Sequence, residues 1–422
     1  MTTATDRAVR RPGVRRTRPY PQLWLAQSVN YFGDQVYAVA LPWLVLNETH
    51  SGSAMELTFA AGMLPYLFFG VVGGSSSDQG HRRRTLLVGN GVAALAVASL
   101  CAVAAASGNP VRTWVFVTVA LVIAAATSYS ASAAESMVPV IFSDPSELRR
   151  ANSYLEASNS VSQVFGPGLA GMLIATFTAI GALGVDAGSF AFAMAVFAMC
   201  AMDRLQGVAP APSAEHRKVG RDIAARWRQG VSRVVRHPVL RAGATLSTLN
   251  NLILGGFDTL LILILHQSDH LGAESVAAVV ACGGLGAVMS AAVIVPRLRV
   301  RRTGLVMVAA IAACGAAAVA IGAVPSLPVA AGAEFIFGAS ATMFNVLWRT
   351  LRQRTAGPDM VGRVAGACRG IAYAGAAIGG LVNAGLLALG AHATSLFVIE
   401  GAMVTAAALG FYLGPLASAT AS

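Results

Sequence analysis

Charged residues are scarce in this 422-residue chain. Only 12% of the residues are Asp, Glu, Lys or Arg, whereas 55% are hydrophobic and the mean hydropathy is +0.64. Soluble domains carry about 25% charged residues, so this chain lacks the charge needed to cover several water-exposed domains. The composition excludes a soluble globular protein, a disordered protein and a nucleic-acid-binding domain. It indicates a protein that crosses a membrane many times.

Lysine, cysteine and the motifs of soluble enzymes are also rare or absent. Lys218 is the only lysine and follows Arg217, so the Gly-Lys pair of a Walker A motif is missing and ATP-driven transport by this chain is excluded. The five cysteines stand in apolar runs without a CxxC pair, which is typical of buried small side chains. His266 and His270 have metal-ligand spacing, but we expect them to face water in a loop. We therefore expect no catalytic residue, no metal site and no cofactor.

Long apolar runs, in contrast, are abundant. A helix needs about 20 apolar residues to cross a bilayer core about 30 Å thick, and the sequence predicts twelve such helices. The first apolar run is too long for an export signal and has no clear cleavage site, so we expect it to be retained as a spanning helix. The predicted spans are residues 22–46, 56–77, 84–106, 113–141, 152–177, 181–203, 240–265, 273–296, 303–323, 327–348, 363–389 and 394–415.

The distribution of basic residues supports this number of spans. With twelve spans, 29 of the 30 Lys and Arg residues fall in the N-terminal tail or in loops on the same side of the membrane. Only Arg112 falls on the opposite side. Because basic loops are retained in the cytoplasm, we expect both termini of the chain to be cytoplasmic.

A long polar segment, residues 204–239, divides the predicted spans into two groups of six. It begins with a Pro-rich linker and continues with apolar residues at helical spacing among arginines. This pattern predicts an amphipathic helix lying on the anionic cytoplasmic leaflet, and a docking site for a partner protein is the alternative interpretation. The predicted organisation is a basic tail (1–21), an N-terminal six-helix half (22–203), this linker (204–239), a C-terminal six-helix half (240–415) and a short tail (416–422).

Polar residues within the predicted spans are candidates for function. A carboxylate near the bilayer centre costs roughly 2.5–3.5 kcal/mol, so it faces the interior of the bundle or water. Asp34 lies in the middle of the first span, on the same helical face as Gln27, Asn30, Tyr31 and Tyr37. We expect this face to line a substrate cavity, and a network of hydrogen bonds between helices is the alternative.

Carboxylates in other spans are candidates for carrying protons. Desolvation disfavours the charged form of a carboxylate, which suits proton exchange near neutral pH. The proton-coupling candidates are Asp34, Asp258 and Glu334, and a solvated position near a helix end is the alternative for the last two. The candidates for the substrate cavity are Gln27, Asn30, Tyr31, Asn159, Gln163, Asn250, Asn251 and Asn345.

The loop between the second and third spans resembles a known family signature. It reads GSSSDQGHRR and is similar to the Gly-x-x-x-Asp-Arg-x-x-Arg-Arg loop of the major facilitator superfamily. In that family the loop is a conformational latch, a role that the resemblance assigns to Gly74, Asp78, Arg82 and Arg83. Gln79 stands where the family usually has Arg. The resemblance implies the major facilitator fold, an all-α membrane protein with 12 transmembrane helices in two six-helix halves.

Further motifs narrow the resemblance. The string FGPGLAG in the fifth span is similar to the Gly-Pro motif of proton-coupled exporters, which implies a bend at Gly166, Pro167 and Gly171. The strings YFGDQVYAVALPWLVL, LPYLFFGVVGG, ELRRANS, RHPVLR and GRVAGACRG, in this order, resemble the enterobactin-exporter and macrolide-efflux branch. Many drug–proton antiporters carry an Arg inside the fourth span, whereas here Arg112 precedes that span.

These resemblances imply a transporter in the cell membrane rather than an enzyme. The expected function is export of a small hydrophobic organic compound, such as a drug, siderophore or secondary metabolite, by proton antiport with alternating access. The expected partners are the substrate, protons and membrane lipid, without nucleic acid, and the expected state is a monomer. An importer of a small nutrient on the same fold and a non-transporting membrane receptor are the alternatives.

Overall fold

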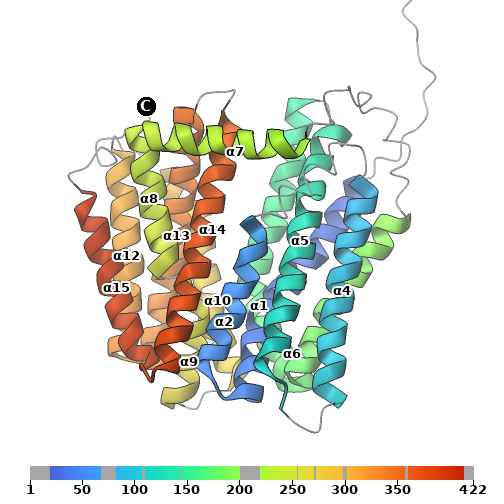
Figure 1. The fold of residues 1–422 in the computed structure, drawn as a ribbon, viewed down its shortest axis with the longest axis vertical. Helices are drawn as coiled ribbons and strands as arrows, with labels where there is room; N and C mark the ends of the chain where they lie inside the picture. Colours follow the sequence, from blue (N-terminus) through green and yellow to red (C-terminus); the bar gives the residue numbers. More distant parts are fainter. Residues whose placement is uncertain are drawn as a thin grey trace, which may run out of the picture.

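A computed structural model describes most of the chain as a bundle of helices. The described residues contain no β-strand. One helix, α7 (Val219–Arg236), lies across one end of the bundle, and the other long helices run roughly perpendicular to it (Figure 1). We call this end the α7 end and the opposite one the far end. The residues described are 20–67, 82–106, 110–142, 144–199, 219–253, 255–269, 272–297, 302–356 and 360–412.

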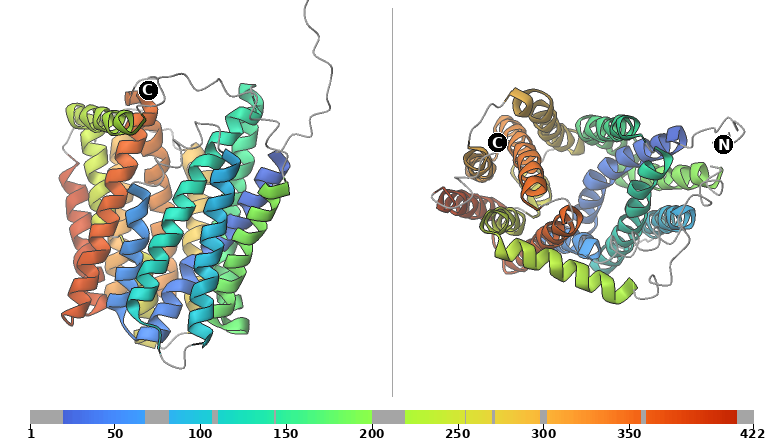
Figure 2. Two further views of the ribbon diagram at one scale, coloured as in Figure 1. Left: turned by 45° about the vertical axis from the view of Figure 1, so that its right-hand side comes forward. Right: turned by 90° about the horizontal axis from the view of Figure 1, so that it is seen from above.

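The helices of the N-terminal half pass between the two ends in alternating directions (Figures 1 and 2). The label α6 covers two legs, because Thr178 leaves helical geometry (φ 65°, ψ 172°) and the chain turns back there. The elements are α1 (Tyr20–Thr49), α2 (Gly52–Met63), the 3-10 turn η1 (Leu64–Leu67), α4 (Arg82–Ala106), α5 (Thr113–Ile141) and α6 (Pro145–Met199).

The C-terminal half follows α7 and has the same alternation. Gly255 and Gly256 form a turn that separates α8 from α9, so the predicted span 240–265 is two helices. The elements are α8 (Pro238–Ile253), α9 (Phe257–Asp269), α10 (Ala273–Met289), the π-helical turn η4 (Ser290–Ile294), α11 (Val295–Arg297), α12 (Thr303–Ala323), α13 (Leu327–Ala356), α14 (Val361–Ala388) and α15 (Ala393–Gly410).

The helices have the length and the exposed surface of membrane-spanning segments. Among the described residues, nine helical segments are long and apolar enough to cross a bilayer. One of them, Ser146–Met199, has 54 residues and covers both legs of α6. Large apolar side chains such as Leu389 (86% exposed) and Met199 (75% exposed) lie on the outside of the bundle, where lipid would cover them. The expected all-helical, multi-pass membrane protein is confirmed.

The two halves pack together along two seams. One seam joins α2 to α14, and the other joins the first leg of α6 to α10. Glycine allows a very close approach in the second seam, because a Cβ atom added to Gly284 would lie 2.2 Å from the carbonyl oxygen of Gln163. Small residues at such positions let helix backbones come together in a membrane, where no hydrophobic force acts between helices.

Contacts between the halves also close the far end of the bundle. The hydroxyl of Ser53 in α2 donates to the carbonyl of Ala384 in α14 over 2.8 Å. Trp43 of α1 packs edge-on against His266 of α9, with 5.4 Å between ring centroids. These residues lie near the ends of their helices, so the two halves meet directly at the far end.

A candidate transport cavity between the halves

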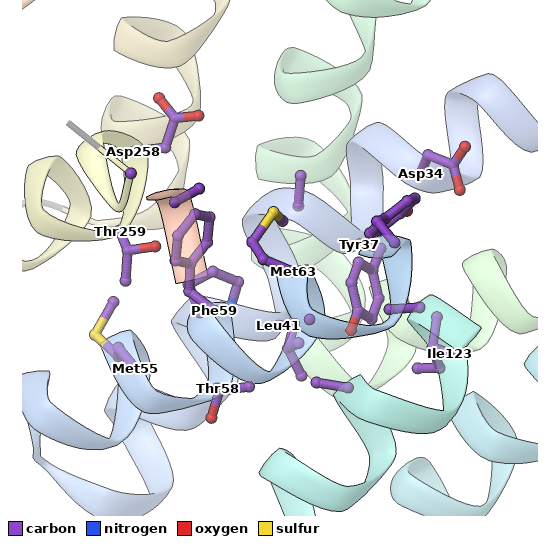
Figure 3. Close-up of a pocket in the computed structure, with 18 of the residues that line it drawn as sticks. Asp34, Tyr37, Leu41, Met55, Thr58, Phe59, Met63, Ile123, Asp258 and Thr259 are labelled. Carbon is purple, nitrogen blue, oxygen red and sulfur yellow. The ribbon is translucent and has the colours of Figure 1, made fainter. Parts of the chain in front are cut away.

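A cavity of about 480 Å³ lies at the interface of the halves (Figure 3). Its wall is formed by residues from α1, α2, η1, α5, α6, α8, α9, α13 and α14 and from the turn before α9. Most of the wall is apolar or aromatic, and none of the described residues that line it is Arg, Lys or His. Its polar lining residues are Asp34, Tyr37, Thr58, Tyr66, Thr127, Asn251, Asp258, Thr259 and Tyr373.

Two aspartates reach this cavity from opposite halves. Asp34 lies 14 residues after the start of the 30-residue helix α1, which is about 21 Å along its axis and close to its middle. Asp258 lies in the first turn of α9, just after the turn at Gly256, where the helix dipole favours a negative charge. Figure 3 shows the two side chains on separate sides of the cavity, Asp34 beside Tyr37 and Asp258 above Thr259.

Each cavity-facing aspartate has a second carboxylate behind it. Asp186, on the second leg of α6, is fully buried and interacts electrostatically with Asp34. It contacts α1 directly, because a Cβ atom on Gly33 would lie 2.7 Å from its Oδ1. Glu334 of α13 is 4% exposed and interacts electrostatically with Asp258. One oxygen of each buried group, Oδ2 of Asp186 and Oε2 of Glu334, has no hydrogen-bond partner in the part of the chain that the structure describes.

A further buried carboxylate lies where the halves meet. Glu56 of α2 is 0% exposed, and neither of its carboxylate oxygens has a hydrogen-bond partner among the described residues. A Cβ atom on Gly256 would lie 2.2 Å from Oε2 of Glu56, so this side chain is enclosed by the turn before α9. The ionisable group that interacts with it electrostatically is Glu400 of α15. Burial of a polar group without a hydrogen-bond partner costs free energy, so Glu56 is a costly group at this contact between the halves.

Of the proton-coupling candidates predicted from the sequence, Asp34 and Asp258 line the cavity and Glu334 lies behind its wall. Of the predicted cavity residues, only Asn251 is in the lining, and its Nδ2 also donates to the carbonyl of Ser247 over 2.8 Å. The predicted cavity residues outside the lining are Gln27, Asn30, Tyr31, Asn159, Gln163, Asn250 and Asn345.

Two of these residues instead belong to contacts between helices. Asn30 is buried, and its Nδ2 donates to Oδ1 of Asn90 in α4 over 2.8 Å. The Nδ2 of Asn90 in turn donates to the carbonyl of Leu86 over 2.8 Å. The backbone of Gln163 lies against Gly284 of α10, in the seam between the halves. The polar face of α1 therefore serves two purposes, a link to α4 at Asn30 and the cavity wall at Asp34.

The predicted latch loop is only partly within the described residues. Gly74 and Asp78 lie outside them, and Arg82 and Arg83 form the first turn of α4. The guanidinium of Arg83 donates from Nη2 to the carbonyl of Ala198 over 2.6 Å. This bond ties the start of α4 to the end of α6, within the N-terminal half.

The predicted bend in the fifth span lies in the first leg of α6. Pro167 is inside the helix, and the residue whose backbone leaves helical geometry is Thr178. Gly166 packs against Gln35 of α1, where an added Cβ atom would lie 2.4 Å from the Cβ of Gln35. Gly171 packs against Ala277 of α10, with a corresponding distance of 2.5 Å. Both glycines thus allow close contacts between helices.

Apart from Tyr37, which lies on the predicted cavity face of α1, the aromatic part of the cavity wall was not predicted from the sequence. Tyr66 and Tyr373 come from opposite halves, and their ring centroids are 5.2 Å apart. Phe257 of α9 stacks on Phe337 of α13 at 3.8 Å. Within an apolar run, such residues cannot be distinguished from packing residues. The two tyrosines were the available signal for the cavity wall, because each places a polar hydroxyl group inside a span.

Comparison with known proteins gives consistent similarities. The profile described as Major Facilitator Superfamily matches residues 23–380. The chain is 30% identical over 376 residues to the multidrug efflux pump Tap of Mycolicibacterium fortuitum. The aligned region covers 86% of this chain and 88% of that protein. It is 24% identical over 166 residues to macrolide efflux protein A of Streptococcus pyogenes, or 39% of this chain and 40% of that protein.

Solved structures give the same fold. The crystal structure of the nucleoside transporter NupG superposes with a TM-score of 0.70 at 10% identity, over 94% of this chain and 98% of that chain. The POT family transporter PepTSo superposes with a TM-score of 0.71 at 16% identity, over 94% of this chain and 97% of that chain. At these identities the likeness concerns the fold alone.

Proposed function

The chain belongs to the major facilitator superfamily, and we propose that it exports small, hydrophobic organic compounds by alternating access driven by proton entry. The observation that carries this proposal is the cavity between the halves, which is closed at the far end by contacts from both halves. In such a transporter the halves rock about a central site and expose it to one side at a time. The protein is a multi-pass membrane protein of the cell membrane.

We infer that twelve helices span the membrane. The nine apolar segments include both legs of α6 as one segment, so counting the legs separately gives ten. Helices α1 and α2 bring the number to twelve. This count supports two halves of six, residues 22–203 and 240–415. Arg82, Arg302 and Arg363 stand at the starts of α4, α12 and α14 at the α7 end. Because basic residues are retained in the cytoplasm, we propose that the α7 end, with both termini, is cytoplasmic.

Asp34 is the proposed principal proton carrier. Its side chain lines the cavity near the middle of α1, so both a proton and a substrate could reach it. A proton from the outside would occupy Asp34, and a cationic or polar group of the substrate entering from the cytoplasm would displace it. Asp258 offers a second such position in the C-terminal half, and Glu334 interacts with it from behind. The latch role of Gly74, Asp78, Arg82 and Arg83 remains part of the proposal.

The proposed substrates follow from the cavity wall and from the relatives. An apolar, aromatic wall with a few polar groups accepts hydrophobic compounds of varied shape. Relatives named as multidrug and macrolide efflux proteins favour export over the import of a nutrient. Substrate, protons and lipid are the proposed partners of a monomeric transporter.

The test is the accumulation of dyes and antibiotics in a bacterial host depleted of its own pumps. Wild type, Asp34→Asn and Asp144→Asn are compared at equal expression, each with and without a protonophore. Asp144 is a matched control, because it lies on an exposed turn and its Oδ1 accepts from the amide of Ser146 over 2.7 Å, a bond that Asn can keep.

The proposal predicts that wild type and Asp144→Asn lower accumulation, that the protonophore abolishes this effect, and that Asp34→Asn is inactive. Export by Asp34→Asn at the wild-type rate would show that coupling does not pass through Asp34. If wild type exports nothing from a broad panel, the multidrug function is wrong.

A further inference from the structure

Helix α7 is held in a defined position on the bundle. It crosses the start of α14, and a Cβ atom on Gly230 would lie 2.3 Å from the carbonyl oxygen of Arg363. Val234 is 3% exposed and belongs to the hydrophobic core. Figure 2 shows α7 at the edge of the bundle when the molecule is viewed from above. The connection between the halves therefore includes a fixed helix at the membrane boundary.

One face of α7 forms a basic hollow beside this crossing. The hollow has a volume of about 600 Å³, and the described residues that line it supply three guanidinium groups, a hydroxyl group and an amide, with no carboxylate among them. The lining residues on α7 follow helical spacing, so they share a face. They are Arg228, Gln229, Ser232, Arg233 and Arg236, and Met360 closes the hollow from the turn before α14.

A fourth cation orients the amide in this hollow. Nη1 of Arg363 donates to Oε1 of Gln229 over 2.9 Å. With this oxygen occupied, Gln229 can offer its N–H groups to a ligand. The hollow therefore presents hydrogen-bond donors and positive charge together. Guanidinium groups bind phosphate oxygens in pairs of parallel hydrogen bonds, so a phosphate group is the ligand that fits this chemistry.

Apolar side chains on the same helix indicate that the phosphate group belongs to a lipid. Val235 is 53% exposed and Trp227 is 49% exposed, although both are apolar. The indole Nε1 of Trp227 also lies near α14, 3.5 Å from a Cβ atom added to Gly370. Exposed Trp on a helix rich in Arg is typical of a helix that lies in the headgroup region of a bilayer. A phospholipid supplies both partners, because its phosphate meets the arginines while its glycerol and upper acyl chains meet Trp227 and Val235.

We propose that the hollow formed by Arg228, Arg233 and Arg236 on α7 is a binding site for the phosphate group of an anionic phospholipid. The bound lipid holds the connection between the two halves against the leaflet and against the start of α14. This site is separate from the transport cavity and does not depend on the transported substrate. If the experiment below finds no lipid binding at this site, the proposed export function is unaffected.

The test measures lipid binding rather than transport. The purified full-length protein in neutral detergent is titrated with phosphatidylglycerol or phosphatidylcholine, and retained lipid is counted by native mass spectrometry. The variant combines Arg228→Gln, Arg233→Gln and Arg236→Gln. The matched control combines Arg84→Gln, Arg297→Gln and Arg349→Gln, which removes the same charge from exposed positions outside the hollow.

We expect wild type and the control to prefer phosphatidylglycerol, and the hollow variant to lose roughly 100-fold in affinity, since each basic residue near a lipid surface contributes about 1 kcal/mol. If the triple variant fails to fold, the single change Arg233→Gln should lower the affinity roughly fivefold by the same argument. Equal retention by wild type and the hollow variant would overturn the proposal.

A parallel titration with inorganic phosphate distinguishes the two sources of a phosphate group. The lipid proposal expects millimolar phosphate to leave phosphatidylglycerol bound, because phosphate alone makes no contact with Trp227 and Val235. Displacement of the lipid by phosphate at that concentration would overturn the lipid assignment, since it would identify a site for a free anion.

Discussion

Replacing Gly284 with Ala should weaken the seam that joins the halves in this conformation. The added Cβ atom would lie 2.2 Å from the carbonyl oxygen of Gln163, whereas ordinary contacts begin near 3.4 Å. The neighbour is a backbone atom of another helix, so it cannot rotate away. The first leg of α6 and α10 would have to separate locally by about 1.2 Å, the difference between these distances. Overpacking of this kind costs roughly 1–3 kcal/mol.

This cost should appear as a change in conformation rather than as unfolding. If the halves separate along this seam when the far end opens, the variant loses stability only in the closed state. A free energy of 1–3 kcal/mol corresponds to a shift of roughly 5–150-fold in the ratio of closed to open molecules. The far-end closure is measurable with Ser53→Cys and Ala384→Cys, because the Ser53 hydroxyl lies 2.8 Å from the Ala384 carbonyl.

The assay is the rate of oxidative cross-linking between these two positions in a background whose native cysteines are replaced by serine. Gly284→Ala should cross-link several-fold more slowly than the parent protein. Gly332→Ala is the matched control, because nothing lies within 4 Å of the added atom in α13. Equal cross-linking of parent and Gly284→Ala would refute the argument that this seam holds the far end closed. A loss in both variants would indicate impaired folding instead.

Two further predictions concern strained or enclosed residues. Glu56→Gln should cross-link at the far end at least as fast as the parent protein, because the change removes a buried carboxylate that has no hydrogen-bond partner among the described residues. Slower cross-linking of the variant would contradict this. Thr178→Gly should raise the thermal stability of the protein. The backbone angles of Thr178, φ 65° and ψ 172°, lie in a region essentially confined to glycine, and another residue there costs roughly 1–3 kcal/mol. A lower melting temperature of the variant in detergent would contradict this.

The positions of the helices followed closely from the sequence. The predicted spans 113–141 and 303–323 coincide with α5 and α12, because each apolar run ends at polar or turn-forming residues. The predicted span 240–265 missed the turn between α8 and α9. The Gly255-Gly256 pair was the signal for it, since glycine weakens a helix interior. Hydrophobicity reports the length of an apolar run and is insensitive to such a local break.

The side chains that face the cavity were harder to predict, for a geometric reason. Helical spacing puts Asn30 and Asp34 on one face of α1, but it does not say what packs against that face at each level. At Asn30 the neighbour is Asn90 of α4, whereas at Asp34 it is open space. The neighbour depends on the crossing of helices that are 60 residues or more apart in the chain. The crossing of these helices cannot be deduced from a single sequence.

The arrangement of the carboxylates links this geometry to the proposed proton coupling. In each half an aspartate lines the cavity and a buried carboxylate lies behind it, Asp186 behind Asp34 and Glu334 behind Asp258. The two members of a pair repel each other when both are charged, so a proton retained by the buried member makes it easier for the cavity-facing one to lose its own. The cavity wall, which has no basic residue among those described, leaves a substrate cation or a proton to neutralise the aspartate. In the proposed mechanism, competition between substrate and proton would therefore require no direct contact between the substrate and the buried carboxylate, and the buried member of each pair would control the charge that the substrate meets.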